Sequence, residues 1–235
     1  MKLLQGHWQL LALTAVVFVL WQTPVIIPLK ILVVFFHEVS HALAAWITGG
    51  EVVSINLSPQ QGGLTTTHGG NLFVIMSAGY IGSLLIGVLL FLIALRSDLD
   101  RKLMGILGAL TLAIAALYIR DWFAIAFCIG LGLVMLGMAR FLPHSTNDLA
   151  LRVIGLISMI YVPFDIFSDT IARSGERSDA YMLAERFGGA TVVWGGLWLV
   201  ISLAVIGLCL RYGLGSQSNI TLQATTAKTP KSPEY

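Results

Sequence analysis

The chain has 235 residues, of which 57% are hydrophobic and only 11% are charged. Soluble domains carry about 25% charged residues, so this composition excludes an ordinary soluble domain and indicates a multi-pass protein of the lipid bilayer. The net charge is +2 and no basic patch alternates with aromatic residues, so we expect no nucleic-acid partner.

Seven apolar stretches are candidate membrane spans, because a span needs about 20 mostly apolar residues. They cover roughly residues 8–23, 25–47, 70–95, 102–119, 121–142, 149–170 and 189–211. The predicted fold class is therefore all-α, a polytopic transmembrane helix bundle of about six or seven spans. We expect one domain over residues 1–212, and a disordered tail over 213–235, which is rich in Ser, Thr, Lys and Pro.

The second apolar stretch contains the sequence His37-Glu38-Val39-Ser40-His41. In a helix, residues four apart lie on the same face, so the two imidazoles can bind one metal ion while Glu38 reaches a water beside it. Ionisable side chains inside a membrane span are costly and usually functional. The motif therefore predicts a metal site in preference to an internal hydrogen-bonded cluster.

Residues 48–69 alternate apolar and polar side chains around Gln60-Gln61-Gly62-Gly63. This pattern predicts a short β-hairpin or a re-entrant loop directly after the second span. For His68, which precedes two glycines, we favour a loop role over a role as a metal ligand.

A catalytic zinc site usually has three protein ligands, so a third ligand must come from another part of the chain. Asp165 and Asp169 follow a largely apolar run in which Pro163 can loosen the helix, and a buried carboxylate there needs a compensating cation. Their four-residue spacing puts both on one helical face, so that one can bind the metal while the other supports it. We favour Asp165, then Asp169, and leave Asp179, His68 or a glutamate open.

Residues 171–188 are polar and charged. Within them, Ser178-Asp179-Ala180 has two interpretations: it supports or gates the site, or it caps a short helix over 180–185. We favour the cap, because serine is among the residues preferred at helix N-termini.

The third stretch carries Ala78-Gly79-Tyr80-Ile81-Gly82-Ser83. Together with the HEVSH helix and the later Pro163-Phe164-Asp165, it resembles the site-2 protease class of intramembrane zinc metalloproteases, and most closely their peptidase M50B-like branch. The resemblance covers roughly residues 25–95 and 150–185.

The chain departs from the motifs of this class at two places. The later family motif is Pro-Leu-Asp-Gly, and Ile166 stands where the glycine would be. The middle family motif is often Gly-Pro-x-Ala-Asn, and here Tyr80 replaces the proline while Ser83 stands at the asparagine. Both departures concern substrate handling more than metal binding.

The resemblance implies that His37, His41 and Asp165 bind zinc and that Glu38 is the general base. The implied reaction is hydrolysis of a peptide bond in or near a transmembrane segment of a membrane-protein substrate. The substrate helix must unwind first, and residues 48–69 would offer the unwound segment strand-like pairing. The expected location is a bacterial plasma membrane, with an organellar membrane left open.

Two rival functions remain as alternatives. A proton- or metal-coupled transporter or channel needs polar groups along a whole transmembrane path, whereas here they gather at one depth on two spans. A non-catalytic zinc-binding scaffold has no need of the base Glu38. The oligomeric state is left open.

Overall fold

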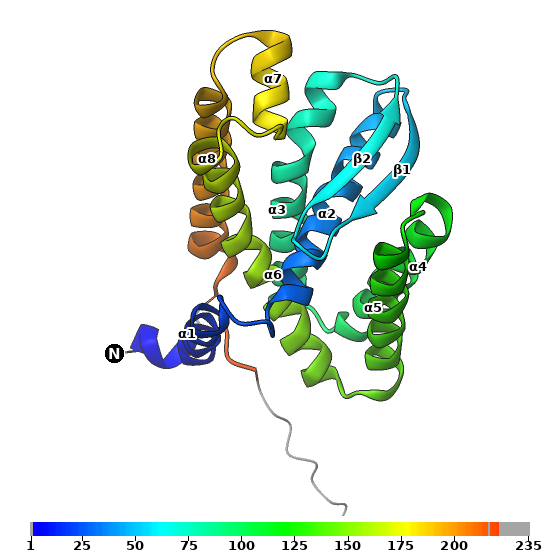
Figure 1. Ribbon diagram of the computed structural model, residues 1–235. Helices are drawn as coiled ribbons and strands as arrows, with labels where there is room; N and C mark the ends of the chain where they lie inside the picture. The colour runs from blue at the N-terminus through cyan, green and yellow to red at the C-terminus, as the bar shows by residue number, and fades with distance from the viewer. Residues whose placement is uncertain (1, 216, 221–235) are drawn as a thin grey trace, which may run out of the picture.

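The computed structural model describes residues 2–215 and 217–220, which form a mostly helical bundle (Figure 1). The long helices are α2 (Ile27–Ile47), α3 (Leu72–Arg96), α4 (Asp100–Tyr118), α5 (Trp122–Phe141), α6 (His144–Phe167) and α8 (Thr191–Leu208). The π-helical turns η1 (Ser168–Ala172) and η2 (Cys209–Gly213) extend α6 and α8. Within the described residues, these six helices are long and apolar enough to cross a membrane, which confirms the predicted fold class.

The first predicted span differs from the other six in the length and the regularity of its helix. It forms α1 (Lys2–Leu20), whose apolar part, Gln5–Leu20, is shorter than the length a span needs. His7 interrupts its helical backbone, with φ −131° and ψ 15°. Helix α1 lies at one end of the bundle, and the short helix α7 (Asp179–Phe187) lies at the other (Figure 1).

The segment after α2 is the predicted β-hairpin. Strands β1 (Glu51–Leu57) and β2 (Gly63–His68) pair antiparallel, with Glu51 opposite His68 and Leu57 opposite Gly63. The hairpin packs along α2 on the side toward α4 and α5 (Figure 1). The outer side of β1 is also paired, because Ile55 forms an isolated bridge with Ile119 at the end of α4.

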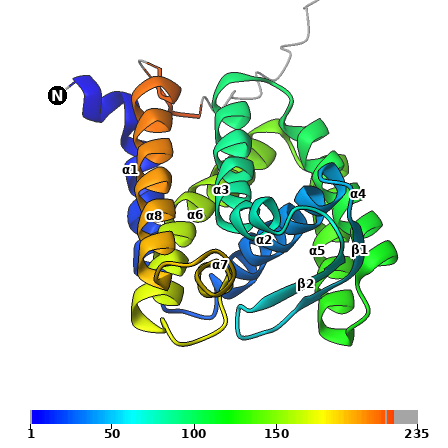
Figure 2. The ribbon, with the colours of Figure 1, turned by 90° about the horizontal axis from the view of Figure 1, so that it is seen from above.

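Helix α3 contacts both α2 and α6 and so connects the two parts of the bundle that carry the ionisable motifs (Figure 2). Its contact with α6 is close, because a Cβ atom at Gly155 would lie 2.6 Å from the carbonyl oxygen of Gly87. Small residues allow this approach of helix backbones, which is common between membrane helices. Residues of α2, α3 and α6 line one cavity between them.

Most of the predicted tail, residues 216 and 221–235, lies outside the described residues. The described part contacts α1: the backbone N–H of Ser218 donates to the carbonyl of Gly6 at 2.9 Å, and Asn219 donates to the carbonyl of Gln5 at 2.8 Å. The domain boundary at residue 212 stays a prediction.

Candidate metal centre

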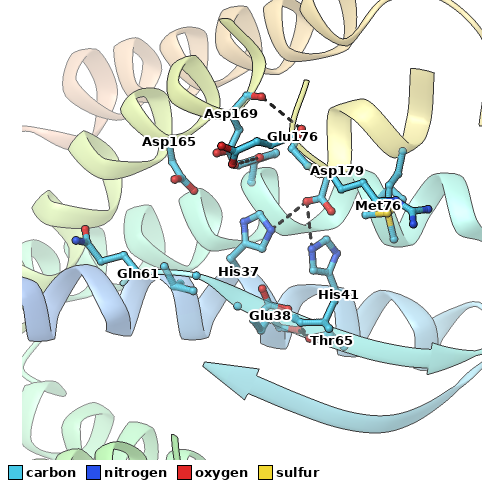
Figure 3. Close-up of a pocket in the computed structure, with 18 of the residues that line it drawn as sticks. His37, Glu38, His41, Gln61, Thr65, Met76, Asp165, Asp169, Glu176 and Asp179 are labelled. Atoms are coloured by element: carbon cyan, nitrogen blue, oxygen red, sulfur yellow. Dashed lines mark hydrogen bonds and ion pairs between the residues drawn. The ribbon is translucent and has the colours of Figure 1, made fainter. Parts of the chain in front are cut away.

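Helix α2 carries both histidines of the HEVSH motif on one face. Their rings lie 4.7 Å apart between centroids, as expected for residues one helical turn apart. The Nε2 atoms of both rings point toward the Asp179 carboxylate (Figure 3), at 3.0 Å for His37 and 3.2 Å for His41. The described part of the chain thus brings two imidazoles and one carboxylate oxygen to a single point.

Asp179 is the first residue of α7, immediately after the residue that caps this helix. Ser178 accepts a hydrogen bond from the backbone N–H of Tyr181 at 3.3 Å, which confirms the predicted cap. Burial alone would raise the pKa of the Asp179 carboxyl, but the attraction of His41 and the hydrogen bonds to both imidazoles outweigh it and hold that pKa below its usual range. Asp179 is therefore a carboxylate at neutral pH, the form that binds cations.

The three side chains fit a metal ion. One ligand atom of each residue lies within 4.8 Å of the other two, and imidazole nitrogen with carboxylate oxygen is a donor set typical of zinc and related divalent metals. The space depends on Gly79 of α3, because a Cβ atom there would lie 2.3 Å from Nε2 of His37 and 2.7 Å from Cε1 of His41. Any larger residue would push into the rings.

His41 is oriented by the backbone of α3. Its Nδ1 lies 2.7 Å from the carbonyl oxygen of Ile75, an acceptor that keeps a proton on Nδ1, so that Nε2, which contacts Asp179 in this structure, is the nitrogen that can bind a metal once it has lost its proton. Metal-binding histidines are commonly held in this way. The tautomer that this contact selects is the one that can bind a metal on the side of Asp179.

Glu38 lies between the histidines in sequence and is held by the hairpin. It is only 4% exposed, and its Oε2 accepts a hydrogen bond from Thr65 Oγ1 at 2.7 Å. The strand can approach so closely because position 63 is glycine: a Cβ atom there would lie 2.3 Å from Oε1 of Glu38. The hairpin therefore fixes the carboxylate that the motif supplies.

A cavity of about 300 Å³ joins these groups. It is lined by the metal group, which we define as His37, His41 and Asp179, and by the acids Glu38, Asp165 and Asp169. Gln60–Thr65 of the hairpin line it as well. The polar groups of the HEVSH helix, of the end of α6 and of α7 therefore share one space, as Figure 3 shows.

The structure does not bring Asp165, the favoured third ligand, into the metal group. Asp165 lines the cavity but stands apart from the two Nε2 atoms, and Asp179 completes the group instead (Figure 3). Asp169 accepts hydrogen bonds from Tyr80 and Arg173. His68 is exposed at the end of β2, opposite Glu51.

The only local pattern in the sequence that draws attention to Asp179 is the helix cap at Ser178, which directly precedes it. Ser178 starts a short helix, so the acid that follows lies in its first turn, in the polar segment that directly follows Asp165 and Asp169. In the sequence the acids nearest the apolar run, Asp165 and Asp169, are the stronger candidates, because no local pattern shows that the short helix after the span returns toward α2.

Comparison with known protein families decides the class of the chain. The sequence model of the Peptidase M50B-like family matches residues 10–209, which is most of the chain. The chain belongs to the Peptidase M50B-like family. No curated protein and no solved structure gave a match.

Membership agrees with the geometry of this M50B-like protein. The matched residues include the whole metal group and every residue that lines the cavity. The chain is therefore a multi-pass membrane protein of a metallopeptidase family, with a possible metal site formed by His37, His41 and Asp179.

Proposed function

We propose that this M50B-like protein is an intramembrane zinc metalloprotease that hydrolyses a peptide bond in or near a transmembrane segment of a membrane-protein substrate. The observation that carries the proposal is the convergence of His37, His41 and Asp179 beside Glu38 in one cavity. Three protein ligands with room for a fourth group are the pattern of catalytic zinc sites, whereas structural sites are usually closed by four.

The proposed ligands are His37, His41 and Asp179. Bound zinc would supply a Lewis acid for the scissile carbonyl and would lower the pKa of water toward neutrality. The chain contributes the orientation of the ligands: the carbonyl of Ile75 sets the tautomer of His41, and Gly79 leaves room for both rings.

Glu38 is the proposed general base. Its carboxylate accepts the proton of the attacking water and later passes it to the leaving amine, as acid–base catalysis in peptide hydrolysis requires. The Thr65 hydroxyl holds Oε2 of Glu38 and leaves Oε1 to exchange the proton. Glu38 also argues against a scaffold, which has no use for a base.

The hairpin is the proposed docking element for the substrate. A peptide bond in a helix is shielded, so the substrate must adopt an extended form before hydrolysis. The outer edge of β1 is already paired at Ile55, whereas Gln60–Thr65, which form the turn and the start of β2, line the cavity. An unwound segment that pairs with β2 would lie beside Glu38.

The rival transport function finds less support in α6. This helix has a second group of charged residues at its other end, where Asp148 and Arg152 form an ion pair. Between Arg152 and Asp165, Ser158 and Tyr161 are the only side chains of α6 that carry polar atoms. A path for ions through the bundle along α6 would need more polar side chains than these two.

The test is Glu38→Gln in the full-length protein, reconstituted in liposomes with a panel of tagged single-span membrane proteins. We expect zinc content equal to that of the unaltered protein, with cleavage of the panel abolished. Glu51→Gln, which makes the same change at an exposed position of β1, is the matched control and should cleave normally. Cleavage by Glu38→Gln at the normal rate would contradict the mechanism. Failure of the unaltered, zinc-loaded protein to cleave any substrate of the panel would contradict it as well.

A further inference from the structure

The two histidines of the metal group are held in different ways. His41 has the usual arrangement, in which Nδ1 lies 2.7 Å from the carbonyl of Ile75. Among the described residues, Nδ1 of His37 has no hydrogen-bond partner, and the ring makes its hydrogen bond through Nε2, to Asp179. A ligand histidine normally needs a second contact to fix its ring orientation. In the part of the chain that the structure describes, what remains to orient His37 is packing against neighbouring rings.

Besides His41, the aromatic ring that contacts His37 is that of Tyr80 in α3. The two rings lie 4.7 Å apart between centroids and meet edge to face, at 82°. This is a favourable geometry for aromatic rings, and it limits the tilt of the imidazole. Tyr80 is only 1% exposed and also packs against Trp198 of α8, at 5.3 Å between ring centroids.

The hydroxyl of Tyr80 is anchored in turn. It donates a hydrogen bond of 2.6 Å to Oδ2 of Asp169, and Oδ1 of the same carboxylate accepts one of 2.6 Å from Arg173. Asp169 lies in η1, where the backbone N–H of Arg173 reaches back to the carbonyl of Ser168, five residues earlier. Such π-helical turns occur frequently at functional sites.

We propose that Tyr80, held by Asp169, is the positioning residue for the metal ligand His37. The tyrosine ring orients the imidazole of His37, as the carbonyl of Ile75 orients that of His41, and the carboxylate of Asp169 fixes the tyrosine through its hydroxyl. Asp169 therefore serves the metal centre without binding the metal. This inference rests on the proposed zinc site and adds to it the device that orients one ligand.

The experiment measures the zinc dissociation constant of the purified full-length protein by competition with a chromogenic chelator. Tyr80→Phe keeps the ring and removes only the anchor, so we expect zinc affinity to fall about 10- to 100-fold, the range for groups that orient metal ligands. With Co²⁺ in place of zinc, the visible spectrum of the variant should shift, because the ligand geometry has changed. Tyr161→Phe, at a buried tyrosine of α6 outside the metal group, should bind zinc normally.

A double-mutant cycle separates positioning from a direct effect of the Asp169 charge. If Asp169 acts on His37 through Tyr80, then Tyr80→Phe weakens zinc binding in the normal background but has no further effect in an Asp169→Ala background. Equal effects in both backgrounds would overturn the link between the two residues.

Two further outcomes have distinct meanings. Normal zinc affinity and an unchanged Co²⁺ spectrum in Tyr80→Phe would overturn the positioning role, even if the variant melts at a lower temperature, because that result indicates a purely structural contact. Absence of zinc binding by the unaltered protein would overturn the proposed function itself and this inference with it. Circular dichroism of each variant checks that the helices are retained.

Discussion

The two sides of the cavity are built in different ways. The side that carries His37, Glu38 and His41 is one regular helix, α2, packed against α3 and covered by the hairpin. The opposite side consists of the π-helical turn η1, the exposed residues 173–177 and the first turn of α7. One side places its ligands by local helix geometry, whereas the other places Asp179 by packing between distant segments.

The position of Asp179 depends on how α7 docks. Phe187 at the end of α7 meets Phe73 of α3, with ring centroids 5.7 Å apart, and Phe73 also meets Trp194 of α8 at 5.9 Å. Trp194 in turn donates a hydrogen bond to the carbonyl of Gly188. Leu183 is fully buried. These contacts hold α7 in the place where its first residue reaches α2.

The side of the cavity that is built on the regular helix α2 should tolerate substitutions least. Gly79→Ala adds a Cβ atom that would overlap the imidazoles of both histidines. We expect loss of stoichiometric zinc, measured by metal analysis of the purified protein, with helix content retained. The control is Gly137→Ala, at a glycine where the same atom meets nothing within 4 Å. Normal zinc content in Gly79→Ala would mean that α3 does not constrain the ligands.

The irregular side should respond more gradually, because several contacts share the docking of α7. Phe187→Ala removes one aromatic contact, worth about 0.5–1.5 kcal/mol beyond the buried area, so we expect zinc affinity to fall about 2- to 10-fold. Chelator competition measures the change. Phe141→Ala, at an exposed phenylalanine of α5, is the control. A complete loss of zinc in Phe187→Ala would contradict this distribution of contacts.

The same difference explains what could be predicted from the sequence. The spacing of His37 and His41 is a local property, so a helical motif in an apolar stretch was enough to place both on one face. The hairpin after α2 and the cap at Ser178 were also local patterns, and both are present. Six of the seven apolar stretches form helices of the expected apolar length, whereas the first, over 8–23, belongs to a shorter apolar helix.

The third member of the metal group could not be placed by such patterns. Asp179 lies 142 residues from His37, and its position depends on the contacts of α7 with α3 and α8. The sequence favours Asp165 because a carboxylate beside an apolar run needs a cation. In the structure Asp165 lines the same cavity but lies outside the group formed by His37, His41 and Asp179, and its role as a ligand stays a prediction. The contact between Tyr80 and His37 likewise depends on how α3 packs against α2.

The most direct test compares zinc content in Asp179→Ala and Asp165→Ala, two single-carboxylate deletions on the same side of the cavity. We expect Asp179→Ala to lose stoichiometric zinc and Asp165→Ala to keep it. Retention of zinc by Asp179→Ala together with its loss from Asp165→Ala would contradict the ligand assignment on which the proposed function depends.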